Sequence, residues 1–335
     1  MQESTKTLEP NISADDLIQQ DLNKKATRRE RIAMLLPYVG IVFLIVFFIL
    51  TTKGGFIKPS NITLLLNQCF TMVIIMVGAV FLYSMGSLDM AIGSVMSLSA
   101  LVISLLYING VPLLLSLLGG IIASALFMSI TATAKSYLHV DPFIASLCVM
   151  NIGAGIVSAT AKVERIVFPY SRALWLDSTY TKVIVLVLVI AAGFTLFKYT
   201  SFSKSLKAIG GNPAVARASG IKVERVTLLA YIVTGVAIGI ASLFAVVRGG
   251  IADTSIGSGM NLNVMIAIVL GGFPLSGGSH ARFSAPIVGA LMVTILINGL
   301  ALMGYANATG YAVRGILFIV VVAMTYEKSK GKLIS

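Results

Sequence analysis

Few side chains in this sequence could carry chemistry, and most of them stand alone. Asp89 is the most conspicuous charge inside an apolar stretch. His139 and Asp141 could relay a proton, but both precede Pro142 in an expected loop, where solvated side chains are the more common interpretation. His280 has no second ligand at a metal-binding spacing. The residues therefore predict neither a catalytic site nor a metal site.

The sequence also lacks the motifs of nucleotide-binding and intramembrane enzymes. It contains no H-E-x-x-H pattern and no Ser–His or paired-Asp constellation within the apolar stretches. No G-x-x-x-x-G-K-[ST] phosphate loop is present, and Gly210-Gly211 lacks the lysine and the strand context of that loop. We therefore expect the chain not to be an enzyme and to hold no cofactor of its own.

Asp89 has two interpretations that the sequence leaves open. A charge within a membrane is costly and usually serves a function, so Asp89 is a candidate for a solute path or its gate. Aspartate is also a good N-cap, and a helix could begin at Met90. Both hold if Asp89 starts a helix in a broken span, because broken spans tend to lie beside transport paths.

The stretch from Ser203 to Arg225 predicts a short helix with sharp boundaries. Asn212 is a good N-cap, and Pro213 suits the first helical position. Gly220 suits the position just after a helix end. The piece between is roughly seven residues, or about 10 Å long. Its small side chains, over which the groove of another protein could close, are Ala214, Ala216, Ala218 and Ser219.

The elements around these residues are those of a membrane protein. Of the 335 residues, 57% are hydrophobic and 11% are charged, and the mean hydropathy is +0.95. A soluble domain has about a quarter charged residues, so this chain cannot cover a water-facing surface. The net charge is +12, but the basic residues gather in a few loops and a tail, which indicates membrane topology rather than nucleic-acid binding.

About ten apolar stretches are candidates for membrane-spanning helices, which need about 20 residues each. They fall at 33–52, 62–85, 91–108, 111–134, 142–161, 182–198, 226–247, 262–273, 283–303 and 312–326. The eighth is short and ends at Gly271 and Gly272, and the second and third are separated only by residues 85–90. Such interruptions often mark broken helices beside a transport path. We therefore expect an all-α polytopic membrane protein.

The distribution of basic residues predicts the orientation. Ten spans place both termini on one side, and basic residues then favour the inner side by about two to one. We expect a basic cytoplasmic tail at 1–32, a transmembrane domain at 33–327 with a cytoplasmic loop at 203–225, and a cytoplasmic tail at 328–335. Asn151, within the fifth stretch, could face a path or bond to another helix, which is its more common use.

Several segments, in order along the chain, resemble the ribose/galactose family of ABC permeases. The most specific is LKAIGGNPAVARASGI, which is similar to the cytoplasmic coupling loop of that family. The matching segments are Phe56–Ile62, Leu88–Leu98, Pro142–Leu147, Leu206–Ile221 and Val269–Gly278. The resemblance covers roughly residues 35–327, the size of one such permease domain.

The resemblance implies a type II ABC importer-like bundle with broken helices and a short cytoplasmic coupling helix. It implies coupling to an ATPase through Ala208, Gly210, Gly211, Asn212, Pro213, Ala214, Ala216, Arg217, Ser219 and Gly220. It implies a translocation pathway near Asp89, Gly93, Ser94, Asn151, Gly271 and Gly272. The implied partners are an ABC ATPase that binds ATP-Mg, an extracytoplasmic solute-binding protein and a second permease copy, identical or paralogous. The implied location is the bacterial cytoplasmic membrane.

The expected function is that of the transmembrane subunit of an ATP-driven importer, which moves a monosaccharide or related small polar solute by alternating access. The chain departs from the family pattern at Met260–Val264 and at Ser279–Arg282, and both departures bear on the solute and on subunit pairing. The alternative is an ion-coupled secondary transporter. That class places ionisable residues at the bilayer midplane, where this chain offers little besides Asp89.

Overall fold

The computed structural model describes residues 37–163 and 166–305 and single positions between 310 and 319. The described residues form helices joined by turns and loops, with one isolated antiparallel bridge between Val167 and Ile251 among them. After a first helix at Pro37–Thr51, the elements are η1 (Gly55–Ile57), α2 (Pro59–Ser84), α3 (Ile92–Ile108), α4 (Leu113–Tyr137), α5 (Pro142–Val163), η2 (Tyr170–Arg172), η3 (Leu174–Asp177), α6 (Thr179–Tyr199), α7 (Ser201–Gly211), α8 (Pro213–Ala218), α9 (Val223–Gly249), α10 (Met260–Leu270) and α11 (Ser284–Leu302).

Six of these helices are long and apolar enough to cross a membrane, namely α2, α4, α5, α6, α9 and α11. Three shorter apolar helices are Pro37–Thr51, α3 and α10. The described part of the chain is therefore helical, and the chain is a multi-pass membrane protein. Every predicted stretch up to 283–303 overlaps one of these helices, whereas the tenth, 312–326, lies largely outside the described residues, as do both predicted tails.

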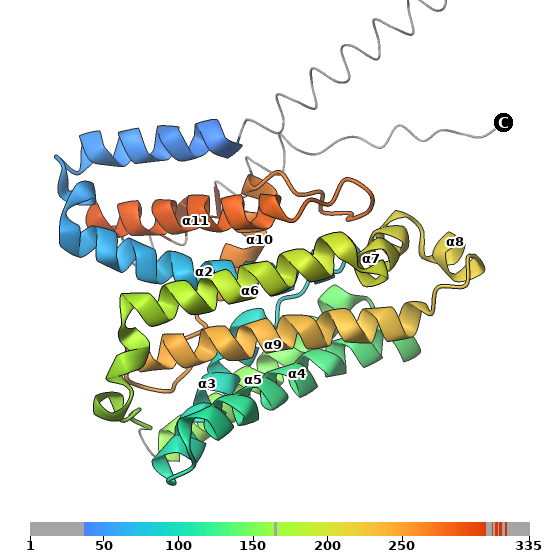
Figure 1. The fold of residues 1–335 in the computed structure, drawn as a ribbon, viewed down its shortest axis with the longest axis horizontal. Helices are drawn as coiled ribbons and strands as arrows, with labels where there is room; N and C mark the ends of the chain where they lie inside the picture. Colours follow the sequence, from blue (N-terminus) through green and yellow to red (C-terminus); the bar gives the residue numbers. More distant parts are fainter. Residues whose placement is uncertain are drawn as a thin grey trace, which may run out of the picture.

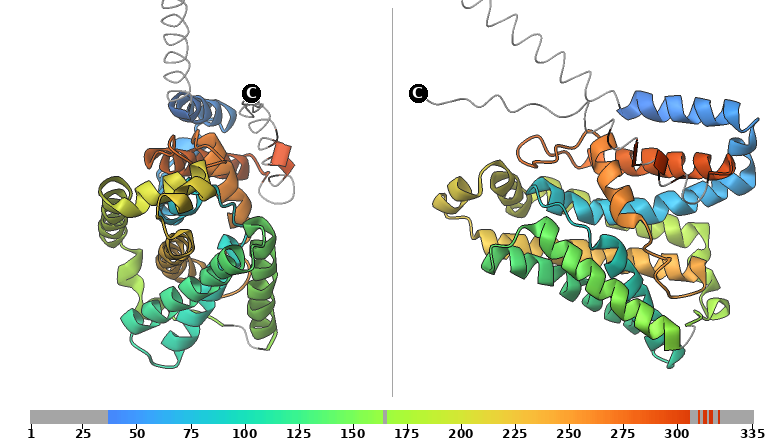
Figure 2. Two further views of the ribbon diagram at one scale, coloured as in Figure 1. Left: turned by 90° about the vertical axis from the view of Figure 1, so that its right-hand side faces the viewer. Right: turned by 180° about the vertical axis from the view of Figure 1, so that it is seen from behind.

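The centre of the bundle is built on α9, which packs against α4, α2 and α3 (Figures 1 and 2). The apolar windows of α9 and α11 are 72% buried, whereas that of α6 is 11% buried and so faces outward. Small residues bring the central helices together: Thr234 Oγ1 of α9 donates to the Gly78 carbonyl of α2 at 3.0 Å. Ser124 Oγ of α4 donates to the Gly235 carbonyl of α9 at 2.7 Å. Such close backbone approach is how helices associate in lipid.

The chain between α2 and α3 is a buried loop, residues 85–91. Gly86, at φ +68°, closes the end of α2, and the Ser87 N–H donates to the Leu82 carbonyl at 3.2 Å. The side chains of Ser87 and Asp89 are fully buried. Irregular backbone is tolerated at such depth where protein surrounds it, so the predicted break between the two spans is present.

The predicted loop 203–225 begins within a further helix, α7 (Ser201–Gly211), which was not predicted from the sequence. In α7, Ser203, Leu206 and Ile209 are buried on one face, and Phe202 stacks on Phe81 of α2 with ring centroids 5.6 Å apart. The spacing of apolar residues at 202, 206 and 209 is typical of an amphipathic helix and was the available signal. Together, α7 and α8 lie at one end of the bundle (Figure 1).

Candidate functional site

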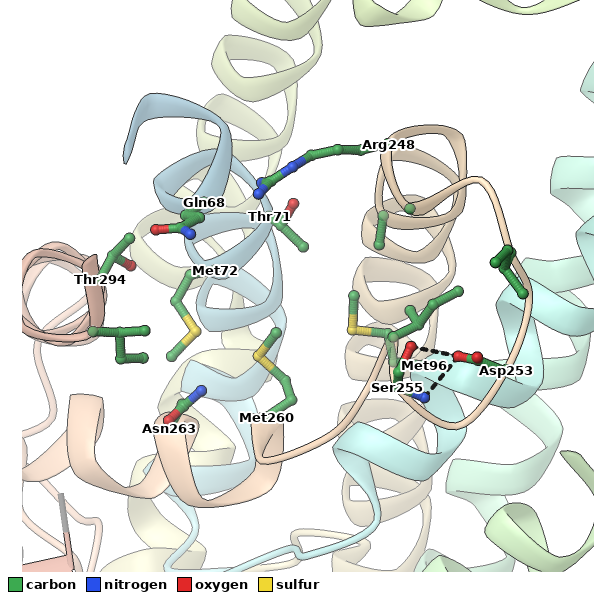
Figure 3. A pocket seen from close by; sticks show the side chains of 15 residues that line it. Gln68, Thr71, Met72, Met96, Arg248, Asp253, Ser255, Met260, Asn263 and Thr294 are labelled. Atoms are coloured by element: carbon green, nitrogen blue, oxygen red, sulfur yellow. Dashed lines mark hydrogen bonds between the residues drawn. The ribbon is translucent and has the colours of Figure 1, made fainter. Parts of the chain in front are cut away.

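A pocket of about 520 Å³ lies among α2, α3, α9, α10, α11 and the loop between α9 and α10 (Figure 3). Its size is within the range of small-molecule sites. It is lined by Gln68, Thr71, Met72, Met96, Ala245, Arg248, Gly249, Ile251, Asp253, Ser255, Ile256, Met260, Asn263, Thr294 and Ile297. Sequence reasoning did not assemble this set, because its members come from segments up to 229 positions apart along the chain (68 to 297).

The polar groups in the pocket are mostly neutral hydrogen-bonding side chains on otherwise apolar helices. Gln68 comes from α2, Asn263 from α10 and Thr294 from α11. Gln68 Oε1 is buried and has no hydrogen-bond partner among the described residues. Such an acceptor favours a ligand or water that can donate to it. The pocket therefore offers a small ligand hydrogen-bonding groups from three helices beside apolar side chains.

Two charged side chains stand at the rim formed by the end of α9 and the loop after it. Arg248 reaches from α9 across the pocket toward Thr71 of α2 (Figure 3). Asp253 accepts hydrogen bonds from the Ser255 N–H at 2.8 Å and from the Ser255 hydroxyl at 2.5 Å. Asp253 thus organises its own loop, and Arg248 is the charge directed into the pocket.

None of the six predicted pathway residues lines this pocket. Gly93 and Gly271 serve close packing: a Cβ on Gly93 would lie 2.4 Å from the Gly257 carbonyl oxygen, and one on Gly271 would lie 2.0 Å from that of Ala285. Gly272, at φ +73°, makes the turn after α10, and Ser94 Oγ donates to the Ala91 carbonyl at 3.0 Å. The assignment of these residues to a path stays a prediction.

Asn151 lies on the exposed face of α5. Its amide donates to the Leu147 carbonyl of the same helix at 2.8 Å, so it makes no bond to another helix in the described part of the chain. The more common use of a polar residue within a span, an interhelical hydrogen bond, is therefore not its use here. The side chain is exposed on the outer surface of the described bundle.

Asp89 is fully buried and stabilises the start of α3. Its Oδ1 accepts a hydrogen bond from the Ala91 N–H at 2.7 Å, one residue before α3 begins. Its Oδ2 has no partner among the described residues. The predicted N-cap of a helix that begins at Met90 is therefore wrong in its position, because α3 begins at Ile92 with Ala91 at its N-cap. The role of Asp89 in a path remains a prediction.

Neighbouring helices hold the loop around Asp89 in place. The Met90 N–H donates to Ser146 Oγ of α5 at 3.0 Å, and Lys135 Nζ of α4 donates to Ser87 Oγ. No three His, Cys, Asp or Glu side chains gather into a possible metal site anywhere in the described part of the chain. The loop is therefore a structural connection among α3, α4 and α5 built from isolated polar contacts.

The short helix at Asn212–Gly220 is present as α8. Asn212 Oδ1 accepts hydrogen bonds from the Ala214 N–H at 2.9 Å and the Val215 N–H at 3.3 Å. Gly220, at φ +81°, ends it, and the Ile221 N–H donates to the Ala216 carbonyl at 3.1 Å. These contacts explain why so short a helix forms without a long apolar face.

The surface that α8 presents differs in one position from expectation. Ala214, Val215 and Ala218 are exposed, with Val215 at 60%, but Ala216 is only 3% exposed and packs into the chain itself. Arg217 forms an ion pair with Glu224 of α9 at 2.6 Å. This pair is exposed and contributes little to stability. The remaining exposed positions of the predicted coupling set are Ala208, Gly211, Asn212, Pro213, Ser219 and Gly220.

Comparison with known proteins identifies relatives along nearly the whole chain. A family model described as branched-chain amino acid transport system / permease component matches residues 61–322. The ribose import permease protein of Bacillus subtilis strain 168 is 29% identical over 301 residues, covering 88% of this chain and 92% of the relative. The L-arabinose ABC transporter permease protein of Azospirillum brasilense is 26% identical, covering 88% of each chain. The xylose transport system permease protein of Escherichia coli K12 is 26% identical, covering 85% and 89%. No solved structure matches the chain.

Proposed function

Because the chain belongs to the family of branched-chain amino acid transport system permease components, we propose that it is the transmembrane subunit of an ATP-driven sugar importer. The named relatives carry ribose, arabinose and xylose, all of them pentoses. A pentose or a related monosaccharide is thus the proposed solute. The neutral hydrogen-bonding groups of the pocket, such as Gln68 and Thr294, fit the hydroxyl groups of such a solute.

The observation that carries the proposal is α8, a short exposed helix held rigid by its own cap. Since the sequence has no phosphate loop, energy has to come from a partner, and α8 offers a small projection on which an ATPase groove can close. ATP-Mg binds in that ATPase. Its closure moves α7 and α8, the helices of the bundle pivot, and access to the solute alternates between the two sides.

The proposed orientation follows the basic residues. With ten spans in the bacterial cytoplasmic membrane, both termini and the 203–225 loop lie in the cytoplasm. The pocket then lies toward the outer side, where an extracytoplasmic solute-binding protein delivers the sugar. A second permease copy, identical or paralogous, completes the importer.

An ion-coupled carrier is the weaker proposal. Such a carrier needs ionisable groups that exchange ions with the solute path. Asp89 is the buried carboxylate of the described spans and their loops, and it accepts the Ala91 N–H just before α3 instead of lining the pocket.

The test is reconstitution of the chain in liposomes with the ATPase and binding protein encoded beside its gene. Uptake of labelled ribose, arabinose or xylose is measured with ATP inside, and with ADP or a proton or sodium gradient as controls. We expect uptake of at least one pentose that requires ATP, the ATPase and the binding protein together. Uptake by the chain alone on an ion gradient would overturn the proposal in favour of the carrier.

A further inference from the structure

Three separate segments of the chain pack backbone against backbone at the C-terminal end of α7. A Cβ on Gly210 would lie 2.3 Å from the Ser84 carbonyl oxygen and 2.6 Å from the Gly278 nitrogen. The Gly278 N–H donates to the same Ser84 carbonyl at 3.0 Å. A Cβ on Gly86 would lie 2.6 Å from the Ser276 carbonyl oxygen. We call this contact of Ser84, Gly86, Gly210 and residues 276–278 the glycine junction.

The glycine junction lacks room for side chains, and this makes it stiff. Closely packed backbone has little freedom to slide, so displacement of one segment displaces the others. In Figure 1, the end of α7 and the loop after α10 lie beside each other at this end of the bundle. Gly210 faces into the junction, whereas a Cβ on its neighbour Gly211 would meet nothing within 4 Å.

Both segments that meet Gly210 lead to helices of the pocket. The loop after Ser84 continues into α3, which contributes Met96 to the pocket wall. Residues 276–278 follow α10, which contributes Met260 and Asn263. The loop also connects to α4 through Ser87, the acceptor of Lys135. A displacement of α7 at the glycine junction would therefore act on the segments that lead to α3, α4 and α10.

We propose that Gly210 is a positioning residue of energy coupling, through which movement of α7 and α8 passes to the 85–91 loop and residues 276–278, and so to α3, α4 and α10. This inference rests on the proposed docking of an ATPase at α8. It assigns Gly210 an inward role, distinct from the outward contact of α8 with that partner.

The matched pair Gly210→Ala and Gly155→Ala tests this role. Gly210 is in α7 and Gly155 is in α5, and neither has a positive φ. A Cβ on Gly155 would meet nothing within 4 Å, so the two variants add the same methyl group and differ in what it meets. In the reconstituted importer, we expect G210A to lower sugar uptake about tenfold, because the added methyl group overpacks a tight contact. ATP hydrolysis and copurification of the ATPase stay near wild type, so ATP consumed per sugar rises, and G155A behaves as wild type.

A second readout follows the movement itself. The variant Ser255→Cys, on the pocket wall, is labelled with a thiol reagent in a chain that also carries Cys148→Ser at its exposed cysteine. We expect ATP to change the labelling rate in wild type and G155A but not in G210A. An ATP-dependent change of wild-type size in G210A would overturn the proposal, as would equal loss of uptake and hydrolysis.

A variant away from the glycine junction keeps the test decisive if G210A does not assemble. The double variant Ser87→Ala/Lys135→Met removes the connection between the loop and α4 and replaces both partners with apolar groups, which is close to neutral for folding. We expect it to assemble and to raise ATP consumed per sugar. Tight coupling in this variant would overturn the proposal. Failure of the proposed function would appear separately, as absence of ATP-dependent uptake in wild type.

Discussion

Asn61 and Asn298 exchange two hydrogen bonds, each 2.9 Å long, between the first turn of α2 and the last turns of α11. Asn61 Nδ2 also donates to the Phe56 carbonyl at 2.8 Å. The two side chains are 6% and 1% exposed, so neither amide can turn to water instead. The pair holds α11 to α2 at the end of the bundle opposite the glycine junction.

The first prediction concerns this amide pair. Asn298→Leu leaves buried Asn61 atoms without their partner and should lower the free energy of unfolding by about 1–3 kcal/mol. The double variant Asn61→Leu/Asn298→Leu should cost less than the sum of the two single changes. Unfolding in detergent, followed by heating or added denaturant, measures both.

Asn109→Ala is the control for the amide pair. Its amide is exposed and donates to the Leu105 carbonyl of its own helix at 2.8 Å, so its loss should change stability by less than about 0.5 kcal/mol. Additive effects of the two single variants at 61 and 298 would show that the pair is not the unit of stability.

The second prediction separates the outward and inward faces of α8. Ala214→Glu places a charge on an exposed position and should abolish sugar-stimulated ATP hydrolysis while the bundle stays folded. Ala216→Glu buries a charge within the chain and should lower thermal stability as well. Hydrolysis and melting temperature are measured on the same preparations. Wild-type sugar-stimulated hydrolysis in A214E would count against docking at α8.

The third prediction tests the cap of α8. Asn212→Ala removes the acceptor of the Ala214 and Val215 N–H groups and should cost the helix about 1 kcal/mol. Asn212→Asp retains that acceptor. We expect faster hydrogen exchange at the amides of 214 and 215 and weaker coupling in the alanine variant, with the aspartate variant near wild type. Unchanged exchange in N212A would mean that other contacts hold α8.

The sequence was sufficient for features that depend on local chemistry. Apolar stretches predicted helices because a spanning segment has to be long and uncharged, and Asn212, Pro213 and Gly220 predicted α8 because caps act on their own neighbours. It was not sufficient for features that depend on distant partners. The role of α7 depends on Phe81 of α2, which lies more than a hundred positions away.

The same reason explains the pathway glycines and the pocket. The place of Gly93 and Gly271 in a path stays a prediction, but their tight contacts with Gly257 and Ala285 could not be identified from sequence spacing. The pocket joins polar residues from four helices, and of these only Asn263 lies within a departure from the family pattern that the sequence shows.

The fourth prediction concerns the pocket as part of the sugar path. Met72→Trp enlarges a buried side chain that lines the pocket and should lower sugar uptake about tenfold or more by occupying space that a small ligand needs. Leu66→Trp, on an exposed position of the same helix, is the control and should transport normally. Uptake by M72W equal to that of L66W would place the path elsewhere.

The last prediction concerns orientation. Lys and Arg favour the cytoplasmic side of a membrane, so the proposed ten spans place both ends of the chain and the 203–225 loop inside the cell. An epitope at either terminus should be inaccessible to antibody or protease in intact cells and accessible after the membrane is opened. An epitope inserted after Gly110, in the open turn between α3 and α4, should be accessible from outside and serves as the positive control. Accessibility of either terminus in intact cells would overturn the ten-span topology, because an odd number of crossings would then separate the two ends or the whole bundle would be inverted.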